Sequence, residues 1–177
     1  IGPKLEAREC IRILEGQKHP SSVVEKSCDL AGIILEMGGI PNGSAEARRI
    51  LESGAAMKKF REIVAAQGGN YDIKSEDLEP GKHMVEVFST KAGYVHSVNN
   101  KDLVSIARAA GSPSDKGAGI LLLRKKGQRV ERGDVLFQIY AEVESKAQRA
   151  RDIAVRLQPL QIEGMLIKKF TSVSVRE

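Results

Sequence analysis

The chain has 177 residues, of which 41% are hydrophobic and 29% are charged, so it is long enough for one ordinary domain or two small ones. Its net charge of +5 comes from 28 basic and 23 acidic residues that are interleaved along the chain. This pattern argues against nucleic-acid binding, which favours one basic patch with stacking partners, and no apolar run approaches the roughly 20 residues that span a bilayer.

The chain begins at Ile1 without a charged and then apolar leader, so no signal peptide is expected. The missing methionine has a second interpretation, in which the sequence is a fragment of a longer protein. Cys10 and Cys28 stand apart within helical patterns and are expected to be buried thiols in a reducing cytoplasm, not a disulfide or a metal pair.

Helical periodicity dominates residues 1–69. The pattern predicts a first helix over residues 5–14 and a second helix that opens with a capping box at Ser22 and ends at Gly38 and Gly39. The second helix is expected to carry four apolar side chains toward one side: Val23, Leu30, Ile34 and Met37.

A third helix is expected to start with Ser44 as its N-cap and to close on Gly68 and Gly69. Gly54 within it predicts a break or a close packing contact. Three helices with short loops form an incomplete bundle, which is expected to pack against something else.

The period changes after a polar linker at residues 70–80. The second half, residues 81–177, alternates short strands with two helices. Strands are predicted at 84–88, 93–98, 120–123 and 135–140, with one or two more between Leu160 and Val175, and helices at 102–110 and 144–157. The expected fold is α+β: an N-terminal helical segment followed by a small, curled antiparallel sheet of the barrel-sandwich type with two helices.

Residues 125–140, here called the wing, combine Gly127, a lone apolar Val130, Gly133-Asp134 and an apolar strand. Such wings are typical of biotinyl- and lipoyl-type domains, whose neighbouring hairpin carries a cofactor on an exposed lysine. The candidate tripeptide, residues 57–59 (MKK), lies in the helical half instead. A cofactor carrier is therefore not favoured.

Other motifs give no active site by themselves. The Gly/Ser-rich loop at residues 111–117 contains Lys116 and resembles a phosphate loop, but such a segment between a helix and a strand is more often only a turn. The three histidines, His19, His83 and His96, lie in separate segments without metal-ligand spacing.

Several segments, in order, resemble the thymidine and pyrimidine nucleoside phosphorylases. Residues 2–9 (GPKLEARE) resemble that family's G-N-A-L-E-V-x-E segment, although Pro3 and Lys4 replace its Asn-Ala. Residues 65–69 (AAQGG) resemble a helix exit, residues 92–95 (AGYV) an A-x-G-x-V strand, and residues 126–136 the K-x-G-x-x-V … G-D-x-L wing. The resemblance covers nearly the whole chain and is closest to the archaeal branch, the AMP phosphorylases.

That resemblance implies that the chain is the C-terminal part of a longer cytoplasmic, oligomeric enzyme with phosphate as its co-substrate and no covalent cofactor. The catalytic residues would lie upstream, so the isolated chain is expected to be inactive. By the same resemblance Glu9 would supply one carboxylate to a monovalent-cation site. The substrate stays open between nucleoside monophosphates and pyrimidine nucleosides, and the alternative is a stand-alone assembly module that uses the wing as an interaction surface.

Overall fold

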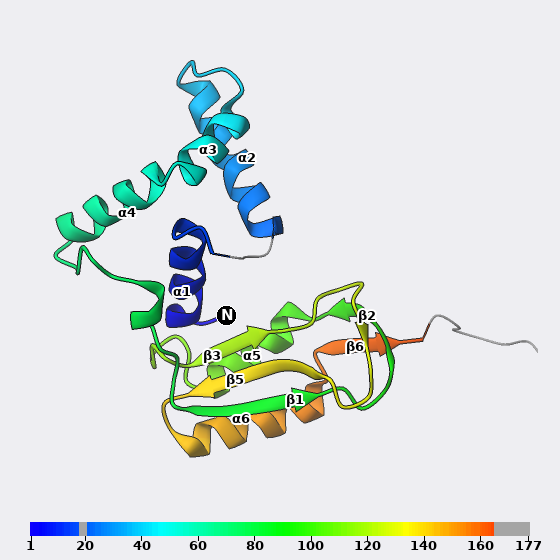
Figure 1. The fold of residues 1–177 in the computed structure, drawn as a ribbon. Helices are drawn as coiled ribbons and strands as arrows, with labels where there is room; N and C mark the ends of the chain where they lie inside the picture. The colour runs from blue at the N-terminus through cyan, green and yellow to red at the C-terminus, as the bar shows by residue number, and fades with distance from the viewer. Residues whose placement is uncertain (18–20, 165–177) are drawn as a thin grey trace, which may run out of the picture. The chain divides into compact units, whose positions relative to one another are not determined.

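The computed structural model describes residues 1–17 and 21–164, which divide into two compact units (Figure 1). One unit comprises Glu6–Glu79, and the other combines Ile1–Leu5 with the described chain from Pro80 onward. Within these described ranges no helix is both long and apolar enough to cross a membrane. The domain boundaries expected from the sequence, with a linker at residues 70–80, remain a prediction.

The N-terminal part of the described chain contains four helices and one short 3-10 turn. They are α1 (Pro3–Leu14), α2 (Ser21–Met37), α3 (Gly43–Glu52), α4 (Ala55–Ala66) and η1 (Ser75–Asp77). Gly39, with φ of +85°, follows α2, and Gly54, with φ of +79°, separates α3 from α4. The predicted stop and the predicted break are confirmed, because both positions need a backbone conformation that glycine adopts without strain.

The predicted starts of two helices differ from the structure. Helix α2 begins at Ser21, so Ser22 lies inside it and is not its cap. Helix α3 begins at Gly43 after Asn42, whose φ is 55°, so Ser44 is not its N-cap. The Ser44 hydroxyl instead donates to Asp29 Oδ1 on α2 at 2.7 Å, because the two helices pack closely there.

The side of α2 that carries the four expected apolar residues is not the side that packs in this unit. Val23, Leu30, Ile34 and Met37 are exposed, Met37 by 84%. The helix packs on α3 through Val24 and Cys28 on its other side, and Cys28 is buried as predicted. Cys10 is exposed, contrary to prediction, because its side chain borders an open groove.

The C-terminal unit contains two antiparallel three-stranded sheets in the order β1-β5-β3 and β4-β2-β6. The strands are β1 (His83–Phe88), β2 (Gly93–Val98), β3 (Gly119–Leu122), β4 (Arg129–Val130), β5 (Val135–Ala141) and β6 (Leu160–Glu163). Its helices are α5 (Asn100–Ala109) and α6 (Glu144–Leu157). The α+β class, the four predicted strands and both predicted helices are confirmed, with α6 at its predicted bounds.

The single curled sheet that the sequence predicts is two separate sheets in the structure. Consecutive strands β1 and β2 do not pair with each other in these sheets: β1 pairs with β5 and β2 with β4 and β6. The alternation of apolar and polar residues predicts where strands lie along the chain, but it does not predict which distant strands pair. Of the predicted tail strands, β6 is present, and anything after residue 164 lies outside the described residues.

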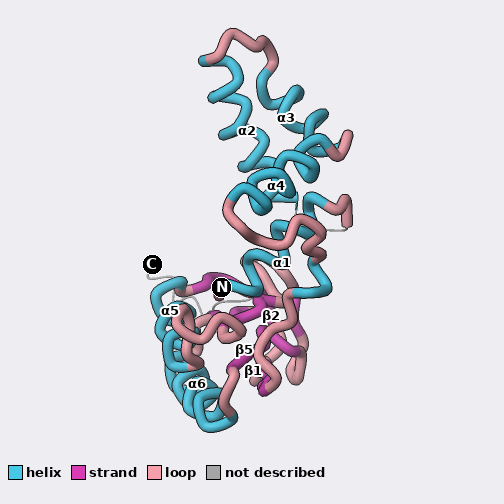
Figure 2. The backbone as a smooth tube through the Cα atoms, turned by 90° about the vertical axis from the view of Figure 1, so that its left-hand side faces the viewer, coloured by secondary structure: helices cyan, strands magenta, loops and turns pink. Residues whose placement is uncertain are grey.

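Helices α5 and α6 lie side by side and pack with β1, β3 and β5 (Figure 2). Helix α6 buries three small residues, Ala147, Ala150 and Ala154, and Ile153 lies against the same core. Their small side chains let the helix approach the strands around the buried Phe137 and Ile139.

The first residues of the chain extend this unit. The Ile120 amide donates to the Ile1 carbonyl at 2.7 Å, and the Lys4 amide donates to the Lys116 carbonyl at 3.1 Å. Gly2 has φ of +125° beside Ala118, where a side chain would meet backbone atoms. These contacts explain why Ile1–Leu5 cluster with the second half of the chain.

Candidate functional site

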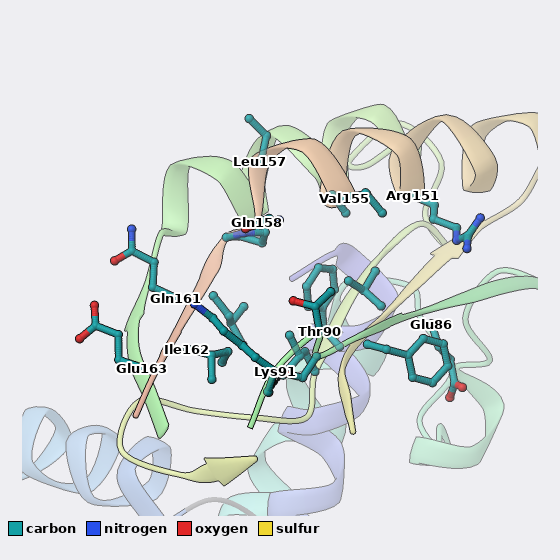
Figure 3. A pocket seen from close by; sticks show the side chains of 18 residues that line it. Glu86, Thr90, Lys91, Arg151, Val155, Leu157, Gln158, Gln161, Ile162 and Glu163 are labelled. Atoms are coloured by element: carbon teal, nitrogen blue, oxygen red, sulfur yellow. Dashed lines mark hydrogen bonds between the residues drawn. The ribbon is translucent and has the colours of Figure 1, made fainter. Parts of the chain in front are cut away.

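A groove of about 590 Å³ lies in the C-terminal unit between the end of β1, the turn that follows it, α6 and β6 (Figure 3). We call it the edge groove, because β1 and β6 are each the last strand of their sheet within the described residues. Its apolar wall includes Phe137, Ala154, Leu160 and Ile162. Edge strands carry backbone groups without a ladder partner, and both of these strands contribute lining residues to the groove.

Polar side chains line the mouth of the edge groove. Lys91, Arg151, Gln158 and Gln161 supply hydrogen-bond donors (Figure 3). The carboxylates there are engaged: Glu86 Oε1 accepts from Gln138 Nε2 at 2.9 Å, and Glu163 Oε2 lies 3.6 Å from His96 Nδ1.

Ser89 is the buried polar residue of the groove, and its hydroxyl donates to the Lys91 carbonyl at 2.6 Å. It therefore holds the turn instead of acting as a nucleophile. The described lining residues include neither histidine nor cysteine. The edge groove combines an apolar wall with polar side chains at its mouth, a composition that suits ligand or segment binding.

Backbone hydrogen bonds join the wing to β2 and to the turn that follows β1. Gly127 and Gln128 exchange bonds of 2.8 and 2.9 Å with Val95 on β2, while Gly133 donates to the Ser89 carbonyl at 2.8 Å. Gly127 and Gly133 both have positive φ, at 87° and 92°. The two glycines therefore shape the turns of a structural element that connects the two sheets.

The Gly/Ser-rich loop is closed by its own contacts. The Gly117 amide donates to Glu142 Oε1 at 2.9 Å, and the Asp115 amide donates to the Gly111 carbonyl. Lys116 Nζ donates to the Pro113 carbonyl at 3.3 Å, and Asp115 Oδ2 accepts from Lys146 Nζ at 2.6 Å. The Glu142 and Asp115 carboxylates would repel a phosphate here, and the Gly117 and Asp115 amides already have acceptors. The loop therefore suits a structural turn better than a phosphate site.

The predicted cation ligand Glu9 lies exposed on α1. Partial burial raises the pKa of the neighbouring Cys10 thiol, and the Glu9 and Glu6 carboxylates raise it further. In residues 1–17 and 21–164, no cluster of three or more His, Cys, Asp or Glu side chains could hold a metal ion. The cation role of Glu9 stays a prediction.

The remaining candidates are scattered. On α4, Met57 is buried and Lys59 pairs with Glu62, so residues 57–59 form part of a helix and not a hairpin tip. His83 opens β1 and His96 lies on β2, whereas His19 lies outside the described residues.

Comparison with known proteins decides the family. Residues 94–157 match the model of the pyrimidine nucleoside phosphorylase C-terminal domain. AMP phosphorylase 1 of Archaeoglobus fulgidus is 48% identical over 171 residues, which cover 96% of this chain and 34% of that protein. The AMP phosphorylases of Methanosarcina mazei and Pyrococcus abyssi are 43% and 47% identical, covering 96% and 95% of this chain and 34% of each relative.

This chain is homologous to the C-terminal third of the archaeal AMP phosphorylases. The resemblance inferred from the motifs is thereby confirmed. The matched phosphorylase domain runs from β2 to α6 and includes the loop at 111–117 and the wing. The chain spans about a third of the length of these phosphorylases.

Sequence reasoning missed two surfaces of this chain: the edge groove and the exposed apolar side of α2. The edge groove could not be predicted from the sequence, because the pairing of the strands decides which strands lie at the edges of the sheets. For α2 a signal was present. Apolar residues recur on more than one side of this helix, and a helix that is apolar on two sides is typically covered on both.

Proposed function

We propose that this chain works as the C-terminal part of an enzyme that converts AMP and phosphate into adenine and ribose 1,5-bisphosphate. The observation that carries the proposal is the match to AMP phosphorylase 1 over 96% of the chain at 48% identity. A pyrimidine nucleoside, such as thymidine, is the second candidate substrate, because the matching domain model bears the name of the pyrimidine nucleoside phosphorylases.

In this reaction an oxygen of phosphate attacks the anomeric carbon of the ribose. The bond from that carbon to the base nitrogen breaks, and the base leaves with the electron pair and takes up a proton. Positive charge develops on the sugar in the transition state, so the bound phosphate stabilises it electrostatically. Closure around the substrates excludes water and favours phosphorolysis over hydrolysis.

The role proposed for this chain is structural: it helps to shape the closing face and the contacts between subunits of a cytoplasmic homo-oligomer. The edge groove supports this role, since it offers hydrogen-bond donors beside two edge strands. Glu9 would supply one carboxylate of a monovalent-cation site that ligands from the rest of the enzyme complete.

A chimera tests the proposal. The last third of the Archaeoglobus fulgidus relative is replaced by this chain, and adenine release from AMP is measured with and without phosphate. The expected result is phosphate-dependent adenine formation, with the relative truncated before the replaced third as the negative control. A folded chimera without activity on AMP or thymidine would contradict the proposal and favour the stand-alone assembly module.

A further inference from the structure

Helix α2 carries apolar side chains on two opposite sides. Val24 and Cys28 are buried against α3. On the other side four large apolar residues form what we call the α2 stripe, with exposed fractions between 55% and 84%: Leu30, Ile33, Ile34 and Met37. A helix that is apolar on both sides is typical of a protein interior.

The helix cannot bury the stripe by turning about its axis, because its other side is fixed to α3. Gly32 and Gly43 lie against each other so closely that a Cβ atom on either would overlap the backbone of the other helix. Glu36 Oε1 accepts from the Gly43 amide at 2.9 Å, and Asp29 accepts from Ser44. These contacts commit the acidic side chains to α3 and leave the stripe facing outward.

An apolar groove of about 510 Å³ adjoins the stripe and shares Ile34 with it. The groove is lined from all four helices of this unit by Cys10, Ile13, Val24, Leu35, Ile50 and Ala56 among others. Groove and stripe together form a contiguous apolar surface, and surfaces of this kind mark sites that another protein segment covers.

We propose that the α2 stripe and its groove are the docking surface for the part of the phosphorylase polypeptide that precedes this stretch. This inference rests on the proposed function. The relatives are about three times as long as the matched stretch, so a large amount of further polypeptide accompanies the same helices in them. The docked segment presents an apolar face without charges opposite Leu30 and Ile34, since burying an unpaired charge there would cost more than the contact returns.

Thiol labelling of α2 tests this without relying on activity. Ile34→Cys places a thiol on the stripe, and Glu25→Cys places one on the exposed polar side of the same helix as the matched control. Both are made with Cys10→Ser, while buried Cys28 reports unfolding. The labelling rate of each site is measured in the isolated chain and in the chimera with the Archaeoglobus fulgidus relative.

The expected result is rapid labelling of both sites in the isolated chain. In the chimera, labelling of the Ile34→Cys variant alone should slow by at least about tenfold, equivalent to ~1.4 kcal/mol of protection. Equal labelling of both sites in the chimera would overturn the inference. So would protection of the Ile34→Cys thiol in the isolated chain that grows with concentration, because a second copy would then cover the stripe.

The same chimera separates this inference from the proposed function. A chimera that is protected at the stripe but inactive would leave docking in place and refute the proposed activity. A chimera that is active but not protected at the stripe would support the proposed activity and refute the docking.

Discussion

Glu15, at the end of α1, is tied to the 3-10 turn η1 at Ser75. Its carboxylate accepts from the Ser75 hydroxyl at 2.6 Å, from the Ser75 amide at 3.0 Å and from Gln17 Nε2 at 2.8 Å. Burial raises the pKa of Glu15, but the two bonds from Ser75, aided by Arg12 and Arg61, outweigh it and hold the pKa below its usual value. The contact therefore stabilises the fold while Glu15 is ionised.

The pH dependence of this contact has a definite sign. Because the folded-state pKa of Glu15 is lowered, its contribution is complete above the ordinary value of 4.5 and is lost as the pH falls through the lower folded-state value. Glu15→Gln should lower the free energy of unfolding at pH 7, and this deficit should shrink below pH 4.5 in urea titrations. The exposed Glu76→Gln serves as control. A Glu15→Gln deficit that is equal at pH 3 and pH 7 would refute this explanation.

Asn99 caps helix α5 with its side-chain oxygen, which accepts from the amides of Lys101 at 3.0 Å and Asp102 at 3.3 Å. Asn99→Ala should cost about 0.5–2 kcal/mol of unfolding free energy, because a helix amide loses its acceptor. Asn99→Gly should cost only a few tenths, since glycine is also accepted at this position. Thermal unfolding of the two variants measures both losses, and an Asn99→Ala variant as stable as the unsubstituted chain would show that the cap contributes nothing.

At the scale of elements, the α2–α3 contact depends on glycine. A Cβ at position 32 would overlap the backbone at Gly43 and Ser44, so Gly32→Ala should separate the helices and cost about 1–3 kcal/mol. The loss is expected although alanine favours helices by about 1 kcal/mol over glycine. Gly164→Ala, whose Cβ would meet none of the described atoms within 4 Å, is the control without a helix contact in urea unfolding. Unchanged or higher stability of Gly32→Ala would contradict the close contact.

The elements also show what a single sequence can and cannot predict. Glycine and periodicity predicted the break at Gly54 and the bounds of α6, because both depend on local backbone preferences. The covered side of α2 and the partners of β1 depend on distant segments, so periodicity identified the apolar residues without assigning their contacts. The edge groove escaped prediction for the same reason.

At the scale of the whole molecule, the order and spacing of weak motifs predicted the family, which the comparisons confirm. The motifs at residues 2–9, 65–69 and 126–136 are individually common, and their sequence along the chain made the match specific. The substrate could not be predicted in this way. Choosing AMP or thymidine depends on side chains that touch the base and the phosphate, and none could be assigned in this chain.

The central claim is that this chain contributes a part to a phosphorylase and not an active site of its own. The most direct measurement is adenine release from AMP and phosphate by the purified chain, beside the chimera at the same molar concentration. The predicted result is phosphate-dependent release by the chimera and none above buffer by the isolated chain, with circular dichroism showing that the chain is folded. Adenine release by the isolated chain in proportion to its concentration would contradict the claim.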